Sequence, residues 1–94
     1  MEFARVFTGY LDREGYSYSD IHRMIGRSRS WVGRIASGAQ LPTNADTIRQ
    51  LASAVGAPAD EFFIAAGRVP DDVHDWITTD TRALPAIRKM MEDQ

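Results

Sequence analysis

The sequence contains no cysteine, no long apolar run and no segment that alternates apolar and polar residues like a half-buried strand. Without cysteine there are no disulfides, thiolate zinc sites or cysteine nucleophiles, and a reducing compartment fits. Without a long apolar run a membrane-spanning helix is excluded. The 94 residues are 44% apolar, which suits one folded domain with a single core. Because the first residues also lack the pattern of a signal peptide, we expect a cytoplasmic protein.

The motifs of common catalytic and metal sites are also missing. There is no glycine-rich phosphate loop and no serine-based catalytic motif. His22 and His74 lie on separate predicted helices without metal-ligand spacing. Asp71, Asp72 and Asp75 lack the glycine and glutamate of a calcium loop, and we interpret them as acidic residues at the positive end of a helix. The sequence therefore predicts no enzymatic activity, no cofactor and no metal.

Positive charge is scarce overall but concentrated in the middle of the chain. The net charge is -2, yet residues 21–49 carry five arginines against one aspartate. Residues 1–20 and 50–94 are both acidic. Binding of nucleic acid depends on the local field rather than on the total charge. The basic middle is therefore a candidate nucleic-acid-binding segment, although short chains also show such unevenness by chance.

Helical spacing of apolar residues, with polar caps and glycine stops, predicts an all-α protein. The expected helices are one that ends near Glu14, one from the Ser17 cap through Ile25, one from Arg29 to Ser37, one that Gly56 ends, one that follows Pro58, one from Asp71 through Ile77, and one that carries Leu84, Ile87, Met90 and Met91. The expected inward faces are Ile21, Met24 and Ile25 in the second helix and Val32 and Ile35 in the third. The threonine cluster after Ile77 is expected to break the sixth helix.

Residues 17–38 have the layout of a helix-turn-helix, because a tight turn with Gly26 joins two short helices. The second helix of this motif places its N-terminal half in the major groove. There an arginine can bind guanine with two hydrogen bonds, a serine hydroxyl can donate to bases or phosphates, and free amides attract phosphate. Arg29, Ser30 and the helix start at Ser28 supply these groups.

The chain from about Phe3 to Phe63 resembles the XRE family of phage-repressor-like and Cro-like helix-turn-helix proteins. The motifs that carry the resemblance are Gly-x-Ser-x-x-x-Ile from Gly15, Ile-Gly-x-Ser-x-Ser from Ile25, Arg-Ile-x-x-Gly from Arg34 and Leu-Ala-x-x-Val-Gly from Leu51. The family implies a five-helix repressor-like domain with one basic recognition helix. We expect this DNA-binding domain over residues 1–66 and a short helical C-terminal extension over residues 67–94.

The resemblance also implies contacts with DNA. Base contacts are expected at Arg29, Ser30, Gly33 and Arg34, and phosphate contacts at Tyr18, Trp31 and Ser37. We add Arg23, Arg27 and Ser28 as phosphate contacts from their positions around the turn. Two positions depart from the family, which often has glutamine at Tyr18 and glutamate at Ala36.

Four of these assignments have a structural alternative. Instead of contacting DNA, Tyr18 could pack over the turn, and Trp31 could cover the seam between the second and third helices. Arg34 could pair with an acidic side chain instead of DNA. Gly33 costs about 1 kcal/mol relative to alanine in a helix. Either the missing side chain lets the helix approach a base closely, or position 33 is a surface position that tolerates any small residue.

Residues 67–94 carry more apolar side chains than two short helices can bury between themselves. They form a homodimer interface through Trp76, Leu84, Ile87 and Met91, or they fold back onto Phe62 and Phe63. The leading hypothesis is a sequence-specific regulator, a repressor, that binds double-stranded DNA. The alternative is an antitoxin-like or adaptor module whose acidic C-terminal third binds a protein partner.

Overall fold

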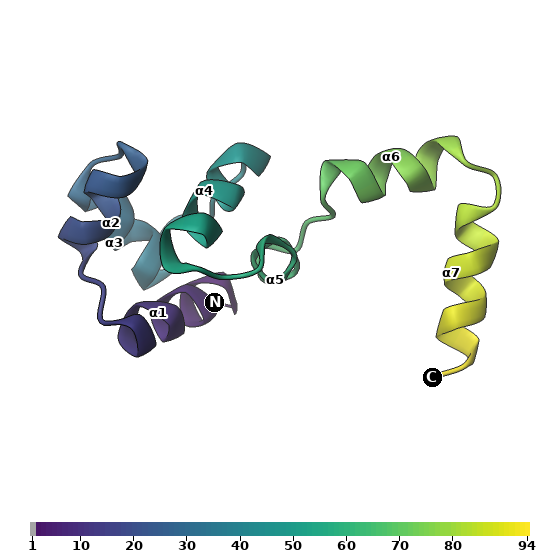
Figure 1. Ribbon diagram of the computed structural model, residues 1–94, viewed down its shortest axis with the longest axis horizontal. Coiled ribbons are helices and arrows are strands. Elements are labelled where there is room, and N and C mark those ends of the chain that lie inside the picture. The colour runs from purple at the N-terminus through teal and green to yellow at the C-terminus, as the bar shows by residue number, and fades with distance from the viewer. Residues whose placement is uncertain (1) are drawn as a thin grey trace.

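Seven α-helices form the secondary structure of residues 2–94, which are the residues that the computed structural model describes (Figure 1). They are α1 (Glu2–Glu14), α2 (Tyr18–Ile25), α3 (Arg29–Ser37), α4 (Ala45–Val55), α5 (Ala59–Ala65), α6 (Asp71–Thr79) and α7 (Ala83–Glu92). These residues include no strand. The all-α fold class expected from the sequence is confirmed.

Local side-chain chemistry explains where α2 begins and ends. The Ser17 hydroxyl accepts a hydrogen bond from the Asp20 backbone N–H at 3.1 Å. In return, the Asp20 carboxylate accepts one from the Ser17 backbone N–H at 2.9 Å. This reciprocal capping box satisfies two backbone donors. Gly26 ends the helix at a φ of 72°, which a residue with a side chain rarely adopts.

The core lies among α1, α3, α4 and α5, and α2 closes it by packing against α3 and α4. Phe62 is at its centre and is fully buried. Its ring meets those of Phe3 and Tyr10 edge to face, at centroid distances of 5.3 and 5.6 Å. Val32 and Ile35 of α3 are also fully buried, as predicted. These contacts fix one side of α3 against the core, and the other side is exposed to solvent.

The predicted inward face of α2 is wrong at one residue. Ile21 is fully buried and Ile25 is half-buried, but Met24 is 54% exposed. At about 100° per residue, positions 21 and 25 point in nearly the same direction, whereas position 24 lies about 60° to one side. The side of α2 that packs against α3 and α4 carries Ile21 and Ile25, and Met24 falls outside it.

The predicted end of the sixth helix at Ile77 is also wrong, because α6 continues through Thr79. The hydroxyls of Thr78 and Thr79 donate to the backbone carbonyls of His74 and Asp75 one turn earlier. These bonds satisfy the threonines inside the helix. The helix ends instead at Asp80, whose carboxylate accepts the Arg82 backbone N–H at 2.9 Å.

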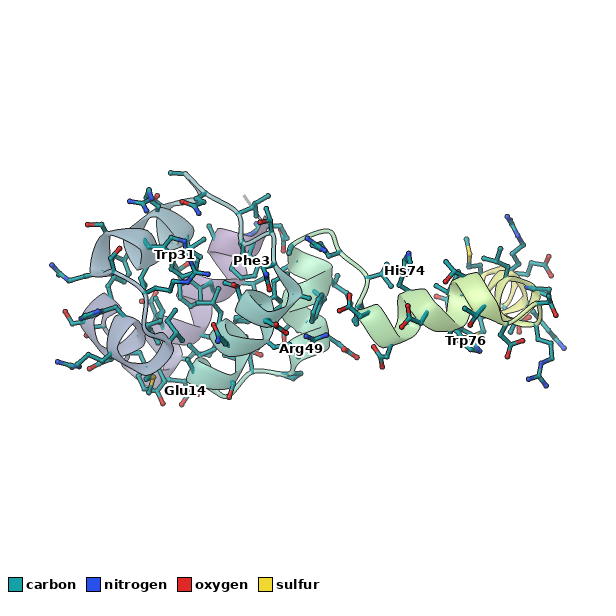
Figure 2. All side chains as sticks on the ribbon, turned by 90° about the horizontal axis from the view of Figure 1, so that it is seen from above. Phe3, Glu14, Trp31, Arg49, His74 and Trp76 are labelled. Carbon is teal, nitrogen blue, oxygen red and sulfur yellow. The ribbon has the colours of Figure 1, made fainter. Side chains whose placement is uncertain are left out.

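Helices α6 and α7 contact each other and lie outside the five-helix core (Figures 1 and 2). Neither helix covers Phe62 or Phe63, which α1 and the Arg49 guanidinium already shield. Two contacts hold the start of this segment: the Arg68 guanidinium donates to the Thr43 carbonyl, and Asp71 lies 3.6 Å from Arg49. Within residues 2–94, the helices are too short or too polar to cross a lipid bilayer.

Candidate nucleic-acid interface

Helix α3 begins at a capped and exposed end. The Ser28 hydroxyl accepts a hydrogen bond from the Trp31 backbone N–H at 3.0 Å, which makes Ser28 the N-cap. Ser28, Arg29 and Ser30 are all exposed. The first turn of a helix also carries amides without a helical partner, and these attract anions. The start of α3 therefore presents hydroxyls, amides and a guanidinium together.

Arg29 stands out among the arginines near this end. No hydrogen bond or ion pair holds its side chain within the described residues, whereas Arg23 and Arg49 both pair with aspartates. A guanidinium without a partner offers all its donors to a ligand. Arg29 lies one residue after the cap, at the exposed start of α3, and its base contact stays a prediction.

Arg27 is fixed by two neighbours instead. Its Nη2 donates to the Thr47 hydroxyl at 3.2 Å, and its guanidinium lies 4.8 Å from the centre of the Trp31 ring. Trp31 is only 7% exposed and belongs to the hydrophobic core. Its main role in the structure is packing, so its phosphate contact stays a prediction that concerns only the exposed edge. Arg27 keeps one positive charge in a defined place beside the turn.

Arg34 donates through Nε to the Gln40 side-chain oxygen at 3.1 Å. No carboxylate of residues 2–94 forms an ion pair with it, so the expected acidic partner is not found there. Ser37 binds locally: its hydroxyl donates to the Arg34 carbonyl and accepts from the Ala39 backbone N–H. Arg34 therefore remains exposed and charged, with its direction set by Gln40.

Tyr18 and Gly33 lie against each other between α2 and α3. A methyl group at Gly33 would meet two carbons of the Tyr18 ring at 3.9 Å, which is ordinary van der Waals contact. Tyr18 is nevertheless 38% exposed. Packing inside the chain therefore does not require glycine at position 33, and the phosphate contact of Tyr18 stays a prediction.

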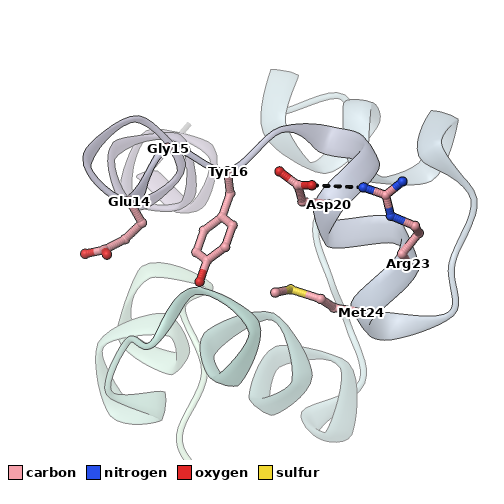
Figure 3. Close-up of a pocket in the computed structure, with 6 residues that line it drawn as sticks. All are labelled: Glu14, Gly15, Tyr16, Asp20, Arg23 and Met24. Carbon is pink, nitrogen blue, oxygen red and sulfur yellow. Dashed lines mark hydrogen bonds and ion pairs between the residues drawn. The ribbon is translucent and has the colours of Figure 1, made fainter.

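The acidic residue of α2, Asp20, is held by contacts within and just before its own helix. Asp20 accepts from Ser17 and pairs with Arg23 at 3.0 Å (Figure 3). The hydrogen bonds from Ser17, with a smaller effect of Arg23, lower the pKa of Asp20. Asp20 and Arg23 also line an open surface hollow of about 470 Å³ with Tyr16 and Met24. No residue of α3 lines this hollow, so it is separate from the exposed end of α3.

Sequence reasoning missed Thr47 and Gln40, which orient Arg27 and Arg34. Each is an ordinary polar residue, and the contacts cross 20 and six residues of chain. No spacing rule within one helix could have found them. The predicted residues from Tyr18 to Ser37 lie on α2, the turn and α3, which pack against each other, but Arg23 lines the hollow that no residue of α3 reaches. Trp76, Leu84, Ile87 and Met91 lie apart from them on α6 and α7.

Helix α2, a tight turn and the capped, exposed start of α3 follow one another along the chain. This arrangement is the geometry of a helix-turn-helix. The model of a protein family described as "Helix-turn-helix domain" matches residues 2–62. The chain belongs to this family, and the match is consistent with an XRE-like DNA-binding protein. No curated protein and no solved structure matches the chain.

Proposed function

We propose that this protein is an XRE-type transcriptional repressor that reads a specific sequence of double-stranded DNA. Helix α3 lies in the major groove, with Arg29, Ser30, Gly33 and Arg34 at the base edges. Tyr18, Arg23, Arg27, Ser28, Trp31 and Ser37 contact the phosphates. Because duplex DNA is the proposed ligand, we infer a cytoplasmic protein.

The observation that carries the proposal is the state of Arg29. Its guanidinium is exposed and has no partner within the described chain, at the helix end that a helix-turn-helix directs into the groove. A bidentate bond to guanine O6 and N7 is the commonest specific contact of arginine with DNA. Arg27 and Arg34, each fixed by a neutral side chain, flank this position with further positive charge.

The proposal includes a homodimer formed by residues 67–94. Trp76, Leu84 and Met91 are 43 to 65% exposed, and Ile87 is half-buried. Two copies related by a two-fold axis place their recognition helices about 34 Å apart, one turn of DNA. A palindromic site is therefore expected.

The test is salt-dependent binding of Arg29→Ala to sites selected from a random duplex pool. We expect a loss of about 1 to 3 kcal/mol at the selected site and a relaxed preference at one base pair. Arg13→Ala is the matched control, because Arg13 lies over the Tyr10 ring on α1. Equal weakening on all sequences would make Arg29 a phosphate ligand.

A second candidate, an antitoxin-like or adaptor module, is favoured by the exposed apolar side chains of α6 and α7. The same titration separates the two. Phosphate contacts release counterions, so log K for a DNA-binding protein falls steeply with log salt. Absence of duplex binding at low salt would favour the protein-interaction module.

A further inference from the structure

Helices α6 and α7 form two arms that meet at a fixed bend, here called the elbow, at Asp80–Arg82. The Arg82 guanidinium bonds both oxygens of the Asp80 carboxylate, each at 3.1 Å. The Arg82 backbone N–H binds the same carboxylate, and Ala83 beside it is fully buried. These bonds lie within the turn between the helices, and Figure 1 shows the two arms at an angle to each other on either side of it.

The arms carry opposite charges that find no partner in each other. Asp72 and Asp75 lie toward the start of α6, and Arg88 and Lys89 lie toward the end of α7. Within the described chain no ion pair joins the two arms, since the arms diverge from the elbow (Figure 1). Glu92, in the last turn of α7, reduces the net charge of that helix to +1, so one chain presents an acidic arm, α6, and a weakly basic arm, α7.

Both arms also expose apolar side chains. Val73 and Trp76 on α6 are 37 and 43% exposed, and Leu84 and Met91 on α7 are 50 and 65% exposed. Ile77 and Leu84 further line a hollow of about 210 Å³ at the elbow. Helices of nine and ten residues are too short to be stable in water without packing. Each arm therefore has an apolar surface to cover and charges to pair.

The register of these charges matches when the acidic arm lies antiparallel to the basic arm of another copy. Asp72 is eight residues before Asp80, and Lys89 is seven residues after Arg82. At 1.5 Å per residue, these side chains lie about 12 and about 10 Å from their elbows. Antiparallel arms with adjacent elbows place Asp72 beside Lys89. A parallel arrangement would place Asp72 beside Leu84 instead.

We propose that the α6–α7 surface binds the same surface of a second copy, with each α6 antiparallel to α7 of the other copy. This inference rests on the homodimer in the proposed function and specifies how that dimer is built. Two α6–α7 segments that stack with their elbows adjacent are related by one two-fold axis. The contact between α6 and α7 of different copies then occurs twice. Such an interface is closed and pairs both sets of charges.

The experiment is charge reversal with mixing, followed by sedimentation without DNA. One variant is Arg88→Glu with Lys89→Glu, and the other is Asp72→Lys with Asp75→Lys. Asp71 is left unchanged because it pairs with Arg49. We expect each variant alone to dimerise at least about tenfold more weakly than the unaltered protein, since like charges then face each other. An equimolar mixture should restore dimers.

Asp12→Lys with Glu14→Lys is the matched control, because it reverses two exposed acids on α1. It should sediment like the unaltered protein. The proposal is overturned if the two variants fail to dimerise when mixed, if either remains fully dimeric alone, or if the unaltered protein is a monomer up to about 100 µM. Circular dichroism verifies that every variant is helical. A dimer that assembles normally but binds no duplex would refute the DNA-binding proposal and leave this one intact.

Discussion

The five-helix domain and the α6–α7 segment have similar apolar side chains but bury them very differently. In α1 to α5, large residues such as Phe7, Ile48 and Phe62 are fully buried. In α6 and α7, Trp76 is 43% exposed and Ala83 is the one fully buried residue. The difference teaches that the domain is stabilised by its own core, whereas the second segment leaves most of its apolar side chains exposed to solvent. Each region contains one tryptophan. The fluorescence of Trp31 therefore reports on the domain, and that of Trp76 reports on the α6–α7 segment.

The largest expected effect comes from placing a charge in each region. Val32→Asp buries an unpaired carboxylate in the core and should prevent folding, at a cost of several kcal/mol. Leu84→Asp is the matched change in α7 and should leave the domain folded. The measurement is thermal unfolding by circular dichroism. A helical, cooperatively melting Val32→Asp variant would contradict the assignment of the core.

Removal of the whole segment should have the next largest effect. A chain that ends at Gly67 should remain folded and become monomeric, because no residue beyond Ala66 belongs to the core. It loses the exposed bond from Arg68 to the Thr43 carbonyl and the exposed Arg49–Asp71 ion pair, and the ion pair is worth less than about 1 kcal/mol. Sedimentation and unfolding of the shortened chain check both points. Unfolding of the truncated chain at room temperature would show that the segment contributes to the core.

A smaller effect is expected from helix propensity. Gly33→Ala should raise the stability of the domain by up to about 1 kcal/mol, since the methyl group fits against Tyr18. The same change should weaken DNA binding if Gly33 approaches a base closely. Ala86→Gly is the reverse change on exposed α7 and should not alter unfolding of the domain. Trp31 fluorescence in a Trp76→Phe background measures the domain alone. Unchanged affinity of Gly33→Ala would favour the tolerant surface position.

The smallest effect concerns pH. Hydrogen bonds from Ser17 lower the pKa of Asp20, and those from Arg82 lower the pKa of Asp80. A carboxyl group with a lowered pKa in the folded state stabilises that state above its unfolded pKa of about 4, and the contribution is lost as the pH falls through the folded pKa. Asp20→Asn should therefore reduce domain stability at pH 7 and change it little under strongly acidic conditions. Asp80→Asn, at the elbow, should not change Trp31-detected unfolding. A similar effect of both variants would mean that the two regions unfold together.

Local signals in the sequence were sufficient to predict the start and end of most helices. Capping residues begin or end a helix through backbone groups only a few residues away, so their effect depends little on the rest of the fold. Those predicted here are Ser17 with Asp20, Ser28, Gly26 and Gly56. The same locality explains why the helix-turn-helix could be recognised. Its motifs are combinations of caps, glycines and core positions.

Contacts across the fold could not be predicted in this way. Gln40 and Thr47 bind arginines through the folded arrangement of loop, turn and α4. The exposure of Met24 depends on which side of α2 meets α3 and α4, and the length of α6 depends on threonine hydroxyls that donate to carbonyls one turn earlier. A sequence pattern predicts which residues could bind DNA. Contacts with residues distant in the sequence determine which of these side chains are bonded within the chain and which are exposed without a partner.

The short connection from α5 to α6 limits the distance between the two recognition helices of the proposed dimer. Only residues 66–70 join these helices, and Arg68 and Asp71 fasten the connection to Thr43 and Arg49. In the proposed dimer, each recognition helix is then joined to the interface through a connection of five residues that these two contacts hold against the domain. One base pair inserted between half-sites rotates one of them by about 34° around the DNA axis. The protein should therefore discriminate between operators by the length of their spacer as well as by their bases.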